Sequence, residues 1–155
     1  MKSMWYYRYP IGEVGIGEED GAVTHLIFHR RGLPDGYAEA ETPLLCKAAK
    51  QITEYFAGER TVFDLPLRLH GTEFQQKVWA ALCTIPYGET RSYKQIAEQT
   101  GNPRACRAVG MANNRNPVSI IVPCHRVVGH NGALTGYGGG LPAKEYLLKL
   151  EQGHG

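Results

Sequence analysis

The sequence predicts a mixed α/β protein in two parts, a strand-rich part that ends near residue 70 and a helix-rich part that follows it. The first 30 residues are rich in aromatic and β-branched side chains between short turn clusters, a pattern typical of β-strands. After residue 70, helix-capping residues precede apolar segments with helical periodicity. Residues 60–71 contain two extended pieces around Pro66, and we place the domain boundary there.

The first part is expected to form strands followed by one helix. The strands are predicted at Trp5–Tyr9, Gly15–Glu18 and Val23–His29. A loop is predicted over Arg30–Glu41, because glycine, proline and aspartate cluster there. Thr42 and Pro43 suit the N-cap and the first position of a helix, and Gly58 suits its end.

Short helices and tight turns are expected in the second part. Thr72 caps the first helix, and two more are predicted at Tyr93–Thr100 and Arg104–Asn114. The three-residue turn between the last two contains a glycine, which gives helix-turn-helix spacing. Beyond them we expect a buried strand at Ser119–Val122 and a glycine-rich hairpin that ends at Gly140. A final helix is expected to start at Pro142.

Composition excludes several classes of protein. No run of about 18 apolar residues exists, so no membrane span is expected. The N-terminal residues lack the apolar core of a signal peptide, so we expect a cytoplasmic protein. The 4 Cys contain no C-x-x-C pair, which indicates free thiols in a reducing compartment. The 6 His have no metal-ligand spacing with them, so neither a metal nor another cofactor is expected.

Charge differs between the two parts. Residues 1–70 hold 8 Lys or Arg and 10 Asp or Glu, giving −2, whereas residues 71–155 hold 9 and 5, giving +4. Chance accounts for a difference of this size as well as function does. The difference nevertheless directs a search for a polyanionic partner to the second part.

The helix predicted at Arg104–Asn114 has two unlike sides. Its inward side is Ala105, Val109 and Ala112. The opposite side is Arg104, Arg107, Ala108 and Met111, with Gly110 beside it. A cationic side of low bulk can approach a nucleic-acid groove closely and reach phosphates. A tightly packed helix with solvated arginines is an equally good interpretation of this segment alone.

Cys124 stands in the tetrapeptide Pro123-Cys124-His125-Arg126. A lone cysteine is usually a small buried hydrophobic residue. Here His125 and Arg126 place proton-accepting and positive groups beside the thiol, which favours the reactive thiolate. A structural cysteine would gain nothing from such neighbours, so the motif indicates a nucleophile.

The segment Ile121–Val128, with sequence IVPCHRVV, resembles the active-site signature of the O6-alkylguanine-DNA alkyltransferases, the methylated-DNA–protein-cysteine methyltransferases. The similarity extends over residues 72–152 and is weaker in the first 70 residues, where only the general layout matches. The other matching motifs are Tyr87-Gly88-Glu89, Ser92-Tyr93, Gly101-Asn102-Pro103-Arg104, Arg107-Ala108-Val109-Gly110, Asn116-Pro117, Gly132, Tyr137, Gly139-Gly140-Leu141, Lys144-Glu145 and Leu147-Leu148.

The resemblance implies a fold and an activity. It implies an α/β protein with an N-terminal ribonuclease-H-like sheet-and-helix domain, residues 1–70, and a helical winged-helix-like domain, residues 71–155. The second domain would bind double-stranded DNA through the minor groove, as a monomer. The alkyl group of an extruded O6-alkylguanine would pass to Cys124 once per molecule, and O4-alkylthymine is left open as a second substrate.

The resemblance also assigns chemical roles. Cys124 would accept the alkyl group, and His125, acting through a water, would take its proton. Glu151 would orient His125 and stabilise the imidazolium, so that the nucleophile, base and orienting group of a catalytic triad are applied to sulfur. Tyr93 would donate a proton or hydrogen bond to the leaving guanine. Arg107 would enter the base stack in place of the extruded nucleotide.

Further residues are implied to contact DNA or the flipped base. The DNA-contacting residues are Arg104, Arg107, Ala108, Arg115, Asn116 and Arg126, and Asn116 would also bridge the recognition helix and the active-site turn. The base pocket would contain Met111, Val127, Tyr137 and Gly138. Tyr137 would stack on the base, and the Gly138 amide would face O6, without the hydroxyl side chain that we expect there in parts of the family.

Three other functions are weighed against alkyl transfer. A non-enzymatic alkyltransferase-like protein would lack the acceptor cysteine, and Cys124 is present. A Cys-His hydrolase would need an oxyanion hole and leaves the helix-turn-helix spacing unexplained. A transcriptional regulator that uses alkylation as its signal would need a separate promoter-binding domain, and we recognise none.

Overall fold

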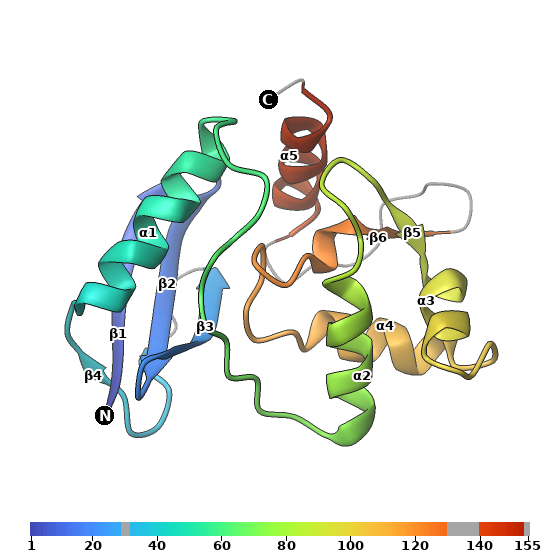
Figure 1. Ribbon diagram of the computed structural model, residues 1–155, viewed down its shortest axis with the longest axis horizontal. Helices are drawn as coiled ribbons and strands as arrows, with labels where there is room; N and C mark the ends of the chain where they lie inside the picture. The colour runs from blue at the N-terminus through green and yellow to red at the C-terminus, as the bar shows by residue number, and fades with distance from the viewer. Residues whose placement is uncertain (29–31, 130–139, 154–155) are drawn as a thin grey trace.

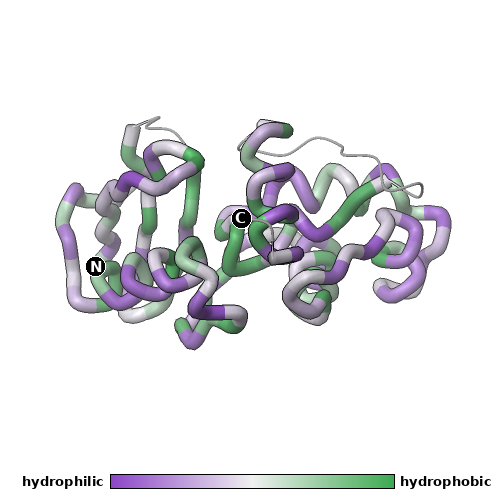
Figure 2. Tube along the Cα trace, turned by 90° about the horizontal axis from the view of Figure 1, so that it is seen from above, coloured by the Kyte–Doolittle hydropathy of each residue, from purple (hydrophilic) through white to green (hydrophobic). Residues whose placement is uncertain are grey.

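The computed structural model describes residues 1–28, 32–129 and 140–153. Figure 1 shows two lobes, a sheet covered by one helix and a cluster of short helices, joined by a long connecting segment. Figure 2, turned by 90°, shows the same two lobes with hydrophobic positions on the strands and on segments between the lobes. Within the described residues, no helix is long and apolar enough to cross a membrane.

The first lobe contains a four-stranded sheet in the order β3-β2-β1-β4. Its strands are β1 (Lys2–Tyr9), β2 (Gly12–Glu19), β3 (Ala22–Phe28) and β4 (Ala38–Glu39). The first three pair antiparallel and confirm the three predicted strands, while β4 runs parallel beside β1. The predicted loop at Arg30–Glu41 is therefore wrong over these two residues, because pairing with β1 depends on a contact distant in sequence.

Helix α1 (Pro43–Phe56) covers one face of this sheet (Figure 1). The Thr42 side chain accepts a hydrogen bond from the Leu45 amide, and Pro43 lies in the first turn, as predicted. The fully buried side of the helix is Leu45, Ala48, Ile52 and Tyr55. These residues share one core with the strand residues Val14, Ile16, Val23 and Leu26. Since burial of a large aliphatic side chain contributes about 1.5–3 kcal/mol, this face holds α1 to the sheet.

The second lobe is built from short elements. They are α2 (Glu73–Leu82), β5 (Arg91–Ser92), α3 (Tyr93–Gln99), α4 (Cys106–Asn114), a 3-10 turn η1 (Cys124–Arg126), β6 (Val127–Val128) and α5 (Leu141–Glu151). Thr72 and Ser92 cap α2 and α3 as predicted, each within a capping box. Helix α4 begins later than the predicted Arg104, because the Ala105 amide still bonds the Asn102 carbonyl in a turn.

Helix α5 lies between the two lobes (Figure 1). Tyr146 of α5 contacts Phe56 of α1, with ring centroids 6.1 Å apart. The same helix packs against η1, the turn that carries Cys124. The last helix of the chain therefore touches both the first domain and the candidate active site.

The strand predicted over Ser119–Val122 is wrong. Ile120 has φ 72°, in the left-handed region, and the Ile121 amide bonds the Ser119 carbonyl at 2.8 Å. The Val122 amide bonds the Val118 carbonyl, so the chain forms a compact turn. The links to β3 are one isolated bridge between Val118 and Leu26, and a hydrogen bond from the Ser119 amide to the Leu26 carbonyl at 3.2 Å. An apolar run of this length cannot distinguish a buried strand from a buried turn, because both exclude water equally.

Candidate active site

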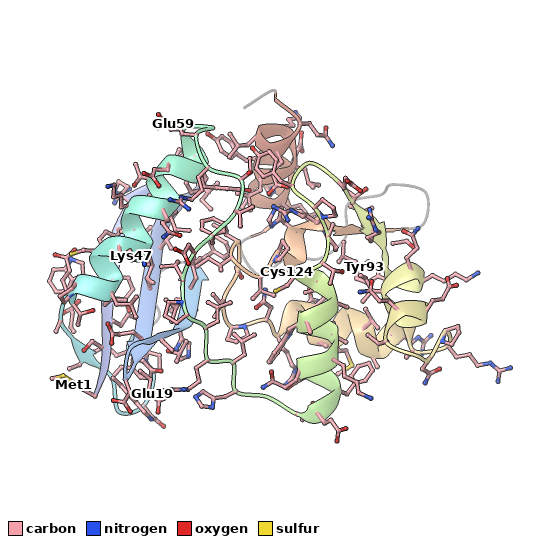
Figure 3. All side chains as sticks on the ribbon, viewed as in Figure 1. Met1, Glu19, Lys47, Glu59, Tyr93 and Cys124 are labelled. Atoms are coloured by element: carbon pink, nitrogen blue, oxygen red, sulfur yellow. The ribbon has the colours of Figure 1, made fainter. Side chains whose placement is uncertain are left out.

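Cys124 begins the η1 turn in the interior of the protein, and its side chain faces the region between the lobes (Figure 3). The residue is only 3% exposed, and its Sγ lies 4.0 Å from the Ser119 Oγ. Burial raises the pKa of the thiol, although hydrogen bonds with Asn116 and Ser119 and the charge of Lys144 act in the opposite direction. The resting thiol is therefore protonated at neutral pH and needs a base before it can attack.

A cavity of about 180 Å³ opens beside Cys124. It is lined by Leu26, Ile27, Phe28, Asn113, Asn114, Asn116, Ser119 and Cys124, so both domains contribute. A larger hollow of about 280 Å³, lined by the connecting segment and by Tyr87 and Arg126, does not include the cysteine. We take the smaller cavity as the candidate site of the reaction, because Cys124 lines it.

His125 and Glu151 form the predicted pair. The Nε2 of His125 lies 2.6 Å from the Glu151 Oε2, and both side chains are buried, at 0% and 1% exposure. Although Glu151 lies in the last turn of α5, its carboxylate is therefore shielded from solvent. Because η1 carries His125 and α5 carries Glu151, the packing of α5 on η1 forms the pair.

Arg126 is the counter-ion of this pair. Its Nε donates to the Glu151 Oε1 at 2.8 Å, and its Nη2 donates to Oε2 at 3.0 Å. The Nη1 donates to the Ile85 carbonyl at 2.7 Å. The expectation that Arg126 contacts DNA is therefore corrected, because the guanidinium is buried and its donors are bound inside the protein.

Two further groups bind the Glu151 carboxylate. The Tyr55 hydroxyl of α1 donates to Oε2 at 2.6 Å, and the Gly88 amide donates to Oε1 at 3.3 Å. With His125 and Arg126, they surround the carboxylate with donors from three segments of the chain: η1, α1 and the loop at Gly88. Sequence reasoning missed both groups, because nothing near Tyr55 or Gly88 in the chain indicates a contact with the last helix.

The surroundings set the charge of each member of the pair. Burial opposes ionisation of Glu151, but hydrogen bonds from His125, Arg126 and Tyr55 outweigh it and lower the pKa to about 2. Burial also lowers the pKa of His125, and this effect exceeds the attraction of Glu151, while Arg126 and Lys144 push in the same direction as burial. At neutral pH the resting pair is an ionised carboxylate and a neutral imidazole.

The other imidazole nitrogen has a different environment. The Nδ1 of His125 is buried and has no hydrogen-bond partner among the described residues, and the same holds for the Oδ1 of Asn113. Asn113 lines the cavity beside Cys124, and its Nδ2 donates to the Cys124 carbonyl at 3.4 Å. Buried nitrogen and oxygen atoms normally form hydrogen bonds with protein or ordered water. Both atoms are therefore suited to form a hydrogen bond with a water or a substrate in the site.

Asn116 joins the end of α4 to the active-site turn. Its Nδ2 donates to the Val122 carbonyl at 2.8 Å, and its Oδ1 accepts from the Val118 amide at 3.0 Å. The side chain thus closes the turn that precedes Pro123 and sets the position of Cys124. This geometry agrees with the bridge that the resemblance implies, whereas a contact of the buried Asn116 with DNA stays a prediction.

The expected DNA-contacting side of α4 is exposed. It consists of Arg107, Ala108 and Met111, continued by Arg104 before the helix and Arg115 after it. Met111, expected in the base pocket, is 60% exposed and lies outside the cavity beside Cys124. We name this set of five residues the α4 surface.

The remaining predicted residues surround the same region. Tyr93, labelled in Figure 3, begins α3, and its half-buried ring lies beside Gly110 of α4. Val127 is buried in β6, which pairs with β5 immediately before Tyr93, and it does not line the cavity. Tyr137 and Gly138 lie outside the described residues.

The fold and this site define a class of protein, in which a sheet-and-helix domain precedes a helical domain that carries a buried Cys-His-Glu arrangement. Residues 4–69 match the family model described as the ribonuclease-like domain of 6-O-methylguanine DNA methyltransferase, and residues 73–153 match its DNA binding domain. The chain belongs to the 6-O-methylguanine DNA methyltransferase family.

Individual relatives agree over almost the whole length. The methylated-DNA–protein-cysteine methyltransferase of Methanosarcina barkeri is 51% identical over 147 residues, which is 92% of each chain. The constitutive enzyme of that name from Bacillus subtilis is 51% identical over 150 residues, covering 92% of this chain and 91% of its own. The crystal structure of Mycobacterium tuberculosis OGT in complex with DNA superposes with a TM-score of 0.92 at 47% identity, over 98% of this chain and 94% of that one.

Proposed function

We propose that this protein repairs alkylated DNA by direct reversal, and that Cys124 accepts the alkyl group of O6-alkylguanine. The observation that carries the proposal is the buried thiol followed directly by His125, whose imidazole is bonded to an ionised Glu151. The relatives carry the name of this activity, and one solved relative is bound to DNA. Since the substrate is DNA, we place the protein in the cytoplasm with the chromosome.

The reaction requires a proton to leave the thiol. His125 is neutral at rest and its Nδ1 is available, so it takes the Cys124 proton through a water. The imidazolium that forms is stabilised by the Glu151 carboxylate at 2.6 Å. Sulfur then bonds the alkyl carbon while the carbon–O6 bond breaks, and Tyr93 supplies a proton or hydrogen bond to the departing guanine.

The product explains why each molecule acts once. The thioether formed on Cys124 has no good leaving group, and no step of the reaction restores the thiol. Repair is therefore stoichiometric, with one alkyl group removed per protein molecule. A hydrolase using the same Cys-His pair would instead release its acyl group to water and turn over.

The α4 surface is the proposed contact with DNA. Arg104 and Arg115 bind phosphates, and the small Ala108 allows close approach to the minor groove. Extruding the damaged nucleotide costs a few kcal/mol. Arg107 offsets part of this cost by occupying the space left in the base stack.

The base pocket and the domain limits remain proposals as well. The extruded base would enter the cavity beside Cys124, with the Val127 carbonyl near its amino group and Met111 at the entrance from the α4 surface. Tyr137 and Gly138 are proposed to complete the pocket. We place the two domains at residues 1–70 and 71–155, with the boundary near the end of the connecting segment that leads to α2 in Figure 1.

Mass spectrometry tests this function directly. The protein is incubated with duplex DNA containing O6-methylguanine and digested. We expect one added methyl group on the peptide that contains Cys124 and none on Cys46, Cys83 or Cys106. With substrate in tenfold excess, repair should stop near one equivalent. Label distributed over all four thiols, or turnover beyond one equivalent, would contradict the proposal.

A further inference from the structure

The first domain contributes a side chain to the buried relay of the second. Tyr55 lies in α1, is fully buried, and its hydroxyl donates to the Glu151 Oε2 at 2.6 Å, across 96 residues of sequence. The same oxygen accepts from the His125 Nε2 at 2.6 Å. One carboxylate oxygen thus joins the helix that covers the sheet to the proposed base.

We propose that Tyr55 is a positioning residue for the alkyl transfer, acting through Glu151 to hold the His125 imidazole in its working orientation. The inference rests on the function proposed above and deepens it, because it assigns the first domain a part in the chemistry. In this view the first domain completes the proton relay and does not only pack against the second domain.

The packing around Tyr55 separates the role of its ring from that of its hydroxyl. The ring lies among aromatic neighbours, with centroids 5.5 Å from Phe56, 5.5 Å from Phe63 and 6.2 Å from Tyr87. A phenylalanine would fill this space equally well. The hydroxyl, by contrast, must be hydrogen-bonded once it is buried, and it meets the carboxylate oxygen that His125 uses.

Geometry explains why a third donor on Oε2 matters. The Arg126 Nη2 reaches the same oxygen at 3.0 Å, and its Nε holds Oε1 at 2.8 Å. Arg126 therefore fixes the plane of the carboxylate, while Tyr55 and His125 share the lone pairs of Oε2. Loss of the hydroxyl leaves the direction of the His125 bond less constrained, because a carboxylate oxygen accepts from a wide range of directions.

Removal of the Tyr55 hydroxyl should also change the pKa of His125, which can be measured. Besides Tyr55, the charged and titratable groups that act on His125 and Glu151 are Arg126 of η1, Lys144 of α5 and Tyr87 of the segment after α2. None of these changes when the Tyr55 hydroxyl is removed. The Glu151 charge is then dispersed over fewer donors and attracts the imidazole proton more strongly, so the pKa of His125 rises.

The test is Tyr55→Phe, with Tyr9→Phe as the matched control. The Tyr9 hydroxyl donates to the Ala49 carbonyl at 2.9 Å, and its ring stacks on Phe56, so the control removes a hydroxyl from the same aromatic cluster without touching Glu151. Single-turnover transfer from O6-methylguanine duplex is measured against pH. The His125 imidazole is titrated by nitrogen-15 NMR in the unreacted proteins, which needs no activity.

We expect Tyr55→Phe to lower the plateau rate by about threefold to tenfold, the usual weight of one buried hydrogen bond. The acidic limb of the rate profile and the NMR midpoint of His125 should both move to higher pH. Tyr9→Phe should leave the rate profile and the NMR midpoint unchanged. Duplex binding by both variants should equal that of the wild type.

Two results would overturn the inference. In the first, rate profile and imidazole midpoint are the same in Tyr55→Phe and wild type. In the second, both variants show parallel losses that follow a common drop in melting temperature, which makes the hydroxyl merely structural. If the wild type itself transfers no alkyl group, the proposed function fails, whereas the NMR comparison still decides whether Tyr55 acts on His125.

Discussion

Arginines close in sequence have opposite environments in the second domain. Arg126 is 6% exposed, and its donors bind Glu151 and the Ile85 carbonyl. Arg104, Arg107 and Arg115 are exposed on the α4 surface. A buried guanidinium keeps a neighbouring carboxylate ionised, whereas an exposed one remains available to a polyanion. Burial, and not residue type, therefore separates the arginine that binds the Glu151 carboxylate from the arginines that we propose to contact DNA.

The largest expected effect is the loss of stability that follows replacement of the buried Arg126. Arg126→Met leaves the Glu151 carboxylate buried without its counter-ion, so the free energy of unfolding should fall by about 3–5 kcal/mol. The same substitution on the α4 surface, Arg104→Met, should change it by less than about 0.5 kcal/mol. Urea unfolding of both variants measures the contrast. Equal losses would mean that Arg126 is not an essential partner of Glu151.

Acid should remove the stability contributed by the buried His125 and Glu151 before it affects the α4 surface. The pKa of His125 is lowered from 6.5 and that of Glu151 from 4.5 to about 2. A group whose pKa is lowered by folding stabilises the protein above its ordinary pKa and loses this contribution as the pH falls through the folded value. Stability should therefore decline first below pH 6.5 and again from pH 4.5 toward pH 2.

The variant Glu151→Gln isolates the second of these declines. Its stability should lie below that of the wild type at neutral pH, and the difference should shrink by about 3 kcal/mol on acidification to pH 2. Thermal or urea unfolding across this range gives the measurement. A difference that stays constant with pH would show that the Glu151 charge is not favoured by folding.

An effect of intermediate size is expected on the repair rate when an arginine of the α4 surface is replaced. Arg107→Ala should slow repair of duplex DNA by about tenfold, equivalent to about 1.4 kcal/mol, because no side chain then fills the base stack. Reaction with the free base O6-methylguanine needs no extrusion and should be unchanged. Arg8→Ala, at an exposed position of β1, is the control for loss of an arginine. Equal slowing on duplex and free base would assign Arg107 to the fold.

The smallest effect concerns a single phosphate contact. Arg104→Ala should weaken duplex binding a few-fold and reduce the slope of log affinity against log salt by about 0.9. Binding isotherms over a range of salt concentrations measure this slope, again with Arg8→Ala as the control. An unchanged slope would remove Arg104 from the contact with DNA and narrow the α4 surface to its helical residues.

Local signals explain which elements could be predicted. The caps Thr42, Thr72 and Ser92 act on amides three residues away, so the start of each of their helices is readable from the sequence. The predicted strand at Ser119–Val122 failed for the opposite reason. Its turn is held by the Asn116 side chain and by contacts with β3, and neither leaves a mark in the apolar run itself.

The residues of the candidate site likewise divide into those that the sequence predicts and those that only the tertiary structure brings together. Cys124 and His125 are adjacent in the chain, so their motif alone indicated a nucleophile beside a base, and resemblance to a family added Glu151. The tertiary structure decided that Arg126 faces this carboxylate and that Tyr55 reaches it from the first domain. Such contacts depend on how α1, η1 and α5 pack, and packing is set by the shape of the whole core, which no local pattern of residues records.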